Sequence, residues 1–449
     1  MSETIKIHKG LDIKLFGEPQ KVIISVDSKK NALKPTDFNA VFPKLLVKEG
    51  DKVKAGTKVF FDKYRDNIFF TSPVSGKITE LVRGPKRVLQ EIKIDADQEI
   101  SYIDFGTSNP NDLKREEIIK KLLESGVWPM IRQRPYSIIA NPEDNPKAIF
   151  ISAFDTAPLA PDYDLMVHGN GDIFQIGLDA LIKLTDGKIH LNLNKAKNVS
   201  KVFSNSKGVQ INYFEGPHPT GNISTQINKI YPINKGDVIW YVNPQDILTI
   251  GRLFLEGKYI ASKIIALTGS EVKNPKYFKT ISGTDISELV ENNLKEGNLR
   301  YISGNVLTGK QIKKDGYIGF YDSQITVIPE GDYYEFIGWA LPGLHKFSFY
   351  RTFISWMTPK KKYRLDTNIN GGERAFVMTG QFEKVFPMDI YPMQLIKAIM
   401  TEDIDQMENL GIFEVDEEDF ALCEYISTSK IEIQSIVRQG LDLMRKEMS

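Results

Sequence analysis

The stretch LVKEGDKVKAGTKVF at residues 46–60 decides the fold of the first part of this chain. Apolar and polar residues alternate along it, which is typical of β-strands with one buried face. Gly50-Asp51 and Ala55-Gly56 supply the turns, because glycine readily adopts the positive φ that tight turns require. The stretch therefore predicts short strands joined by tight turns.

A second strand–turn–strand follows as TSPVSGKI at residues 71–78. Together the two stretches resemble the flattened β-sandwich of lipoyl and biotinyl carrier domains, and we predict such a sandwich over residues 1–105. A carrier domain holds its modified lysine at a hairpin tip, near Lys63 here. Ten positions separate Lys63 from Pro73, more than a tight hairpin needs. We interpret Lys63 as a surface lysine, with a modified lysine as the alternative, and the sandwich as structural.

Composition limits the classes of protein that this chain can represent. Its 449 residues suggest about three domains at roughly 150 residues each. Lys plus Arg is 58 and Asp plus Glu is 58, so the formal net charge is zero. A neutral chain has no overall field that draws it to nucleic acid, so general nucleic-acid binding is excluded as a function class.

The chain has few residues that could bind a metal ion or form a disulfide. The single cysteine, Cys423, can form no intrachain disulfide and cannot supply the four thiolates of an iron–sulfur cluster. We expect it to be a buried structural thiol rather than a reactive one. The five histidines show no zinc-ligand spacing, so no metal site is predicted. The first residues lack the apolar core of a signal peptide, and no apolar run reaches ~18 residues. These features predict a cytosolic chain whose membrane role is peripheral.

The next region has the alternation of an α/β domain, which we place at residues 106–255. Residues 111–123 have helical spacing and Gly126 ends that helix. The apolar run at residues 148–154 suits a buried parallel strand. A helix at 177–185 and strands at 188–193, 199–203 and 209–214 complete the pattern.

Two further units follow. Residues 256–328 carry two strands, a turn at 274–275 and a helix capped by Thr284 or Asp285, and they resemble the soluble-ligand-binding β-grasp (SLBB) modules; a plain packing module is the alternative. Residues 329–449 form an aromatic-rich stretch followed by helices at 392–400, 403–409 and 431–446. The chain as a whole is predicted to be an α+β or α/β multidomain protein.

Cofactor motifs are missing where they would be expected. No glycine-rich phosphate loop follows a strand, and Phe154 and Pro158 after the strand at 148–154 would block close approach of a pyrophosphate. No GxSxG motif is present. The sequence GPHPTGN at residues 216–222 holds His218 between two prolines. Such a rigid loop either lines a site or links domains, and we favour the domain-linking turn.

The segment WPMIRQRPY at residues 128–136 joins the first helix to the α/β core. Its two arginines, flanked by aromatic residues, suit an anionic or planar polar group, through guanidinium hydrogen bonds and ring stacking. The alternative interpretation is a surface loop with partly buried aromatic side chains.

Several motifs together resemble one family, the A subunits of the Na+-translocating NADH:quinone oxidoreductase (Na+-NQR), a bacterial membrane complex. The resemblance covers essentially the whole chain. The motifs that carry it are SPVSGK at 72–77, GPHP at 216–219, DTN at 366–368, GGERAFV at 371–377, PMD at 387–389 and EEDFALC at 417–423.

The resemblance implies a peripheral subunit on the cytoplasmic side of the bacterial inner membrane, without a tightly bound cofactor and associated with quinone access. The complex oxidises NADH, reduces quinone (ubiquinone) and moves sodium ions. It implies FAD, FMN, riboflavin and Fe–S in other subunits, and contact of this chain with the membrane only through partner subunits. Catalytic residues are therefore expected elsewhere.

The same domain order resembles the flavin-binding subunit of respiratory complex I and the C subunit of the Rnf complex. Those relatives carry a glycine-rich flavin loop where this chain has residues 128–136, and cysteine motifs where it has only Cys423. The runner-up function is accordingly a flavin-dependent NADH dehydrogenase-type electron-transfer subunit with a degenerate nucleotide pocket.

Two groups of residues are the candidate sites. A quinone headgroup would stack on aromatic rings while an arginine stabilises charge on the reduced oxygen. The quinone-proximal candidates are Trp128, Arg132, Arg134 and Tyr136. Large aromatics beside basic residues suit a docking interface, although they would equally fill a C-terminal core. The partner-docking candidates are Trp339, Phe347, Phe349, Tyr350, Phe353 and Trp356.

Overall fold

The largest sheet of the protein has seven strands in the order β1–β14–β13–β12–β15–β10–β11. The computed structural model describes residues 4–197, 199–338 and 341–448. The strands of this sheet are β1 (Thr4–Lys6), β10 (Arg132–Arg134), β11 (Ile138–Ile139), β12 (Ala148–Ser152), β13 (Lys188–Asn194), β14 (Gln210–Glu215) and β15 (Ile239–Tyr241). Strands β14, β13, β12 and β15 run parallel, which confirms the predicted α/β unit.

The order of the strands creates a switch point in this sheet. From β12 the chain crosses to β13 and β14 on one side, and it then returns to β15 on the other side of β12. The crossover from β12 to β13 and the crossover from β14 to β15 therefore cover opposite faces of the sheet, and the switch point lies between the carboxyl ends of β12 and β15. This is the position at which open α/β sheets bind ligands.

Alternate residues of β12 pack into two different cores. Ile149 and Ile151 belong to the core shared with the β-sandwich, whereas Ala148 and Phe150 belong to the core shared with the C-terminal helices. This alternation follows from the two-residue period of a strand. Because both faces of the sheet are covered, its central strand is apolar from Ala148 to Ile151.

Six α-helices belong to the α/β unit within the part of the chain that the structure describes. They are α1 (Arg115–Ser125), α2 (Tyr163–Val167), α3 (Gly171–Ile182), α4 (Lys201–Ser204), α5 (Ile223–Ile230) and α6 (Pro244–Glu256). As predicted, Gly126 ends α1 with a left-handed φ of 73°. The strand predicted at residues 199–203 is wrong: Ser200 accepts a hydrogen bond from the N–H of Val202, which starts the short helix α4.

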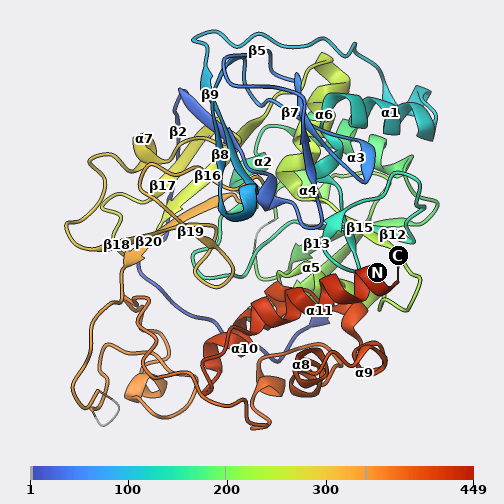
Figure 1. Cartoon of the computed structure of the whole chain (residues 1–449). Helices are drawn as coiled ribbons and strands as arrows, with labels where there is room; N and C mark the ends of the chain where they lie inside the picture. Colours follow the sequence, from blue (N-terminus) through green and yellow to red (C-terminus); the bar gives the residue numbers. More distant parts are fainter. Residues whose placement is uncertain (1–3, 198, 339–340, 449) are drawn as a thin grey trace.

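The predicted sandwich is confirmed as two small sheets that face each other at the top of Figure 1. One sheet has the order β3–β9–β8–β5 and the other β4–β6–β7. Their strands are β3 (Lys30–Leu33), β4 (Pro43–Leu45), β5 (Lys52–Val53), β6 (Lys58–Asp62), β7 (Arg65–Thr71), β8 (Gly76–Arg83) and β9 (Leu89–Ala96). The stacked rings of Phe60 and Phe70, 4.3 Å apart, lie in the core that the sandwich shares with the α/β unit.

The β-grasp unit has a six-stranded sheet in the order β19–β18–β20–β16–β17–β2. Its elements are β2 (Gln20–Ser25), β16 (Ser262–Thr268), β17 (Lys276–Ile281), α7 (Ser287–Val290), β18 (Leu299–Ser303), β19 (Lys310–Ile312) and β20 (Gln324–Pro329). The Asp285 carboxylate accepts the N–H of Ser287, so one of the two predicted capping residues lies at the start of α7.

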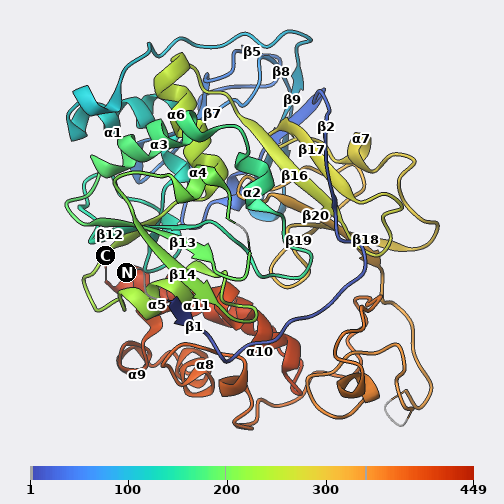
Figure 2. The same ribbon diagram turned by 180° about the vertical axis from the view of Figure 1, so that it is seen from behind.

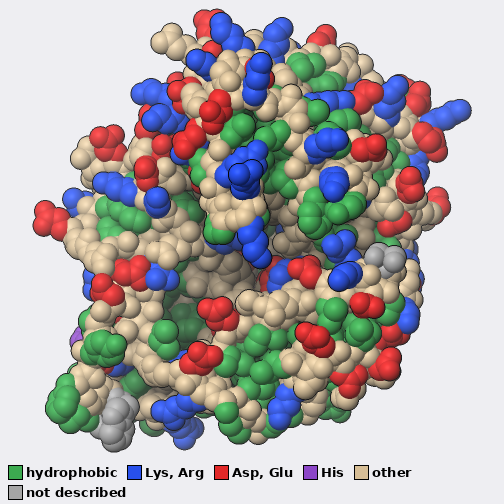
Figure 3. Space-filling view, viewed as in Figure 1, with side chains coloured by type: hydrophobic (Ala, Val, Ile, Leu, Met, Phe, Trp, Pro, Cys, Tyr) green, Lys and Arg blue, Asp and Glu red, His purple; other side chains and the backbone are tan. Residues whose placement is uncertain are grey.

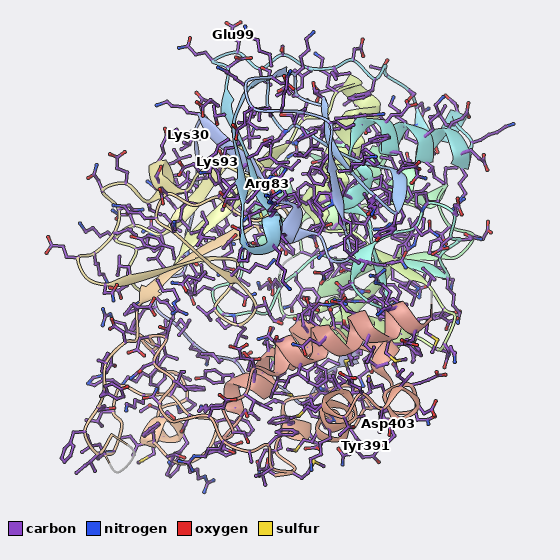
Figure 4. The ribbon with its side chains drawn as sticks, viewed as in Figure 1. Lys30, Arg83, Lys93, Glu99, Tyr391 and Asp403 are labelled. Atoms are coloured by element: carbon purple, nitrogen blue, oxygen red, sulfur yellow. The ribbon has the colours of Figure 1, made fainter. Side chains whose placement is uncertain are left out.

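The C-terminal region ends in a group of helices that cover one face of the α/β sheet (Figure 1). They are α8 (Pro392–Met400), α9 (Ile404–Asn409), α10 (Ala421–Ile426) and α11 (Ile433–Glu447). Tyr391 and Asp403 precede α8 and α9 and lie on the outer side of the group (Figure 4). The Asp403 carboxylate caps α9 by accepting the N–H of Gln406.

The first 25 residues differ from the expectation that residues 1–105 belong to the sandwich alone. Strand β1 extends the α/β sheet beside β14, and β2 extends the β-grasp sheet beside β17. Between them Leu15 forms a bridge with Tyr363 of the C-terminal region. Figure 2 shows this segment running from β1 past the C-terminal helices to β2. The N-terminus thus ties three units together.

Candidate functional site

A cavity of about 120 Å³ lies at the carboxyl ends of β12 and β15, at the switch point of the sheet. It is smaller than the ~300–1,000 Å³ of typical ligand pockets. It therefore has room for a small ring or one end of a longer ligand, and not for a whole dinucleotide. The wall residues that decide its chemistry are Arg132, Asp155, Tyr163, His218, Tyr241 and Glu418.

Arg132 is the cation of the cavity, and two tyrosine rings hold it. Its guanidinium carbon lies 4.5 Å from the ring centroid of Tyr241 and 4.2 Å from that of Tyr321. The Tyr321 hydroxyl donates to the carbonyl of Pro129 at 2.7 Å, which fixes that ring. Cation–π contacts of this kind stabilise a guanidinium while leaving the edge of its plane open.

The hydrogen-bond donors of Arg132 are unused within the part of the chain that the structure describes. No side chain or carbonyl there accepts a hydrogen bond from this guanidinium, although the residue lines the cavity. A guanidinium presents five N–H donors in a rigid plane. The cavity therefore offers a fixed, charged donor group to any acceptor oxygen that enters it.

Two carboxyl groups line the same cavity. Burial raises the pKa of Asp155, whose carboxylate accepts the N–H of Ala157 at 2.8 Å. Burial also raises the pKa of Glu418, against the opposing effect of Arg134. Tyr163 is held in its neutral form, because burial raises the pKa of its hydroxyl. Arg132 is the cation that faces these groups in the cavity wall.

The loop at residues 216–222 is a wall of the cavity, so our preference for a domain-linking turn is wrong. His218 is only 4% exposed, and its Nδ1 lies 3.1 Å from the hydroxyl of Thr156. Burial lowers the pKa of His218 to about 4, which makes the ring neutral at physiological pH. Its backbone N–H donates to the Asp12 carboxylate, so the loop also fastens the N-terminal segment.

A buried chain of hydrogen-bonded amides, which we did not predict from the sequence, underlies the cavity. The Asn212 side-chain amide donates to the Asn192 side-chain oxygen, and the Asn192 amide donates to the Gln226 side-chain oxygen. The Gln226 amide in turn donates to the Ser152 hydroxyl, and the donor–acceptor distance is 2.8 Å in all three hydrogen bonds. Buried amides are stable only when they are hydrogen-bonded, and these satisfy one another. The signal was available in the polar alternation of KIHLNLN along β13.

Arg134 serves a structural purpose. It is two residues from Arg132 on β10 and lies on the same face of the strand, but its side chain is only 1% exposed. It forms an ion pair with Asp416 and donates to Glu418 at 3.0 Å. Arg438 of α11 approaches the same group and donates to Glu417 at 3.0 Å. These ion pairs join the C-terminal helices to the α/β unit.

Not all acids of this cluster ionise together. The neighbouring guanidinium of Arg134 keeps the pKa of Asp416 well below its ordinary range, despite burial. Burial and the adjacent Asp416 raise the pKa of Glu417 to about 8. Burial and Glu418 likewise raise the pKa of Asp419 to about 8. The cluster thus retains protons at neutral pH.

The four predicted quinone-proximal residues do not form one open surface, contrary to the expected loop. Trp128 is completely buried in a short 3₁₀ helix (Trp128–Met130), and its indole N–H donates to the carbonyl of Ala140. Tyr136 is half-buried against the ring of Phe413. Among the four, Arg132 alone lines the cavity. A role of Arg132 beside quinone stays a prediction.

The predicted docking aromatics divide into two groups. Phe347, Phe349 and Tyr350 pack against the core of the C-terminal helices, as the core alternative supposed. Phe353 is half-buried, whereas Trp356 is 53% exposed. Trp339 lies outside the described residues. A docking role stays a prediction, and Trp356 is the member best placed for it.

Cys423 and Lys63 are the two residues for which the sequence raised the question of covalent chemistry. Cys423 is fully buried in α10, and burial raises the pKa of its thiol well above the ordinary value, as expected for a structural thiol. Lys63 lies with Tyr64 in the tight turn between β6 and β7, so the expectation of a longer connection is wrong. Both interpretations of Lys63 stay open.

The described residues contain no helix long and apolar enough to span a membrane. Within the same ranges, no three His, Cys, Asp or Glu side chains come together in a way that would hold a metal ion.

Comparisons with known proteins agree on one family. The model of the NqrA N-terminal barrel-sandwich hybrid domain matches residues 5–97, that of the NqrA second alpha/beta domain matches residues 113–259, and that of the NQRA C-terminal domain matches residues 264–314. Together they cover well over half of the chain.

Relatives match over the full length. The chain is 38% identical over 447 residues to a Pasteurella multocida protein, and 39% identical over 448 residues to a Haemophilus influenzae protein. Both carry the name of the A subunit of Na(+)-translocating NADH-quinone reductase, and each match covers 99% of this chain and 100% of the relative. A crystal structure of an NAD+-reducing NiFe-hydrogenase is similar at 10% identity with a TM-score of 0.36, over 50% of this chain and 48% of the other. That likeness is too low to support a conclusion.

Proposed function

This chain belongs to the NqrA family, the A subunits of the Na(+)-translocating NADH-quinone reductase, and on that premise we propose that it is a peripheral accessory subunit on the cytoplasmic side of the bacterial inner membrane. In this proposal it contributes to quinone access and to assembly of the complex. Flavins, iron–sulfur and the hydride and sodium chemistry are assigned to other subunits. No catalytic centre is evident in the described residues.

The observation that carries quinone access is the unused donor set of Arg132. A quinone headgroup is a flat ring with carbonyl oxygens that gain negative charge on reduction. Tyr241 and Tyr321 hold the guanidinium in place, so its N–H groups can meet such an oxygen without further ordering. The cavity of about 120 Å³ suits a small ring whose tail extends outside.

Arg132→Ala should lower kcat/KM of the assembled complex for quinone by about tenfold or more, because a hydrogen bond to a charged group contributes ~1.5–3 kcal/mol. Steady-state kinetics with a short-chain quinone and inhibitor titration measure the effect. Tyr136→Phe is the matched control, because the Tyr136 side chain packs on Phe413 and does not line the cavity. This variant should leave kcat/KM for quinone and the inhibitor sensitivity unchanged. Unchanged kinetics in Arg132→Ala would refute a role of this residue in quinone access.

The runner-up function, a flavin-dependent NADH dehydrogenase-type subunit, makes a different prediction. Phe154 lines the cavity and Pro158 follows in the same loop, where a nucleotide-binding loop would have glycine. The cavity is also too small for a flavin nucleotide. We expect the purified chain to have no visible absorption before or after NADH is added. A flavin spectrum that bleaches with NADH would favour the runner-up and overturn the accessory role.

A further inference from the structure

The C-terminal region contains a stretch whose charge is one-sided. Residues 336–365 include six Lys or Arg and no Asp or Glu, in a chain whose net charge is zero. We call residues 341–361 of this stretch, which include its most exposed side chains, the aromatic–basic lobe. It lies in the orange segment at the lower left of Figure 1. In Figure 3, hydrophobic side chains protrude from this corner, and Lys and Arg side chains lie on the lower edge beside them.

The apolar tip of the lobe is held in place by a buried serine. In the 3₁₀ helix Ile354–Met357, Ser355 is only 5% exposed and its hydroxyl bonds with the backbone of Ser348. The other side chains of this turn face solvent: Ile354 is 37%, Trp356 53% and Met357 64% exposed. A convex turn therefore presents three large apolar side chains to water.

The rest of the lobe is tied to this turn. Lys361 donates to the carbonyl of Leu344 at 2.6 Å, and Leu344 is itself 60% exposed. The guanidinium of Arg351 lies 5.0 Å from the ring centroid of Trp356. The exposed apolar residues and the basic residues thus form one continuous surface.

Half of the positive charge on this stretch is uncompensated. Acids from elsewhere in the chain neutralise three of the six bases, in the pairs Lys346–Glu335, Lys362–Glu18 and Arg364–Glu271. Arg351, Lys360 and Lys361 have no acidic partner among the described residues. The surface that carries Trp356 is consequently cationic.

We propose that the aromatic–basic lobe inserts into the interfacial region of an anionic lipid bilayer. This inference rests on the proposed function as a subunit of a membrane complex, and it replaces the expectation that membrane contact is made only through partners. Trp beside aliphatic side chains suits the headgroup level, and Lys and Arg are drawn to anionic lipids. A protein partner is less well matched, because the apolar groups stand on a convex turn and Lys is depleted at protein interfaces.

The test is sedimentation of the full isolated chain with vesicles of phosphatidylcholine, and with vesicles in which phosphatidylglycerol replaces part of it. Binding is expected only to the anionic vesicles, and to weaken with salt because the attraction is screened. Lys360→Glu/Lys361→Glu should reduce vesicle binding by at least about tenfold, since each base near an anionic surface contributes about fivefold. Trp356→Ser/Met357→Ser should reduce it as well.

The matched control is Lys52→Glu/Lys54→Glu, which makes the same change in net charge on exposed residues of the sandwich and should bind like the unchanged chain. Equal losses in both charge-reversed variants would mean attraction of the whole chain rather than of the lobe, and would overturn the proposal. So would an absence of binding to anionic vesicles.

A second experiment distinguishes a failure of lipid contact from a failure of the proposed accessory role. Trp356→Ser/Met357→Ser is also tested for co-purification with the membrane subunits in detergent, where no bilayer is present. Retained co-purification together with lost vesicle binding supports lipid contact. The opposite result is that the variant no longer co-purifies and the unchanged chain does not bind vesicles. That result would assign the lobe to a protein partner. It would overturn lipid contact and leave the accessory role intact.

Discussion

Arg134→Ala is expected to destabilise the protein by about 3–5 kcal/mol, because it leaves buried carboxylates without their cation. The Arg134 side chain is 1% exposed, and Asp416, its main partner, is 7% exposed. Water therefore cannot replace the guanidinium, and the pKa of Asp416 that Arg134 keeps low would rise. The free energy of unfolding, from denaturant titration, measures the loss.

Two further variants make this prediction specific. Arg300→Ala removes a partly exposed arginine that pairs with Glu330 at 2.6 Å, and it should cost no more than about 1 kcal/mol. Adding Glu418→Gln to Arg134→Ala should recover part of the loss, because the second change removes one of the abandoned charges. A loss under about 1 kcal/mol in Arg134→Ala would show that the cluster does not hold the C-terminal helices in place.

Trp128→Ala should destabilise the protein by about 3–5 kcal/mol, the usual cost of removing a large buried aromatic side chain. Trp128 is completely buried, lies 5.5 Å from Trp240 in an edge-to-face contact, and donates its indole N–H to Ala140. The variant would leave a cavity and an unpaired carbonyl. Thermal and denaturant unfolding curves give the change.

Trp356→Ala is the natural comparison, because the same side chain is removed from an exposed position. It should alter the free energy of unfolding by no more than about 0.5 kcal/mol. If Trp128→Ala instead leaves stability unchanged and alters quinone kinetics, then Trp128 acts in the site and its buried placement is wrong.

Local signals in the sequence were sufficient for much of the fold. Gly126 ends α1, Pro392 begins α8, and the apolar run at residues 148–154 forms a buried parallel strand, because each depends on neighbouring residues. The strand predicted at 199–203 failed because the apolar residues of VSKVF lie at positions i, i+3 and i+4, which is the spacing of one turn of helix. Ser200 as an N-terminal cap decided between strand and helix.

The site was harder to predict because its partners are distant in the sequence. Residues 128–136 look like a loop, since prolines interrupt them, yet Arg132–Arg134 form a strand beside β15. The residues near Arg134 in the sequence do not indicate that it pairs with Asp416 and Glu418, which lie more than 280 positions away. Arg132 and Arg134 are only two residues apart in the sequence. In the fold, Arg132 lines the cavity and Arg134 forms a buried ion pair with Asp416.

The path of the N-terminal segment has a consequence for how the protein is made on the ribosome. Strand β1 needs β14, β2 needs β17, and Leu15 needs Tyr363, which emerges almost 350 residues later. At roughly 5–20 residues per second, Leu15 in the N-terminal segment waits about 20–70 s for its partner Tyr363. Until β17 emerges, Val22, Ile23 and Ile24 of β2 are an unpaired apolar strand that chaperones can bind. The start of the chain is therefore among the last parts of this protein to fold.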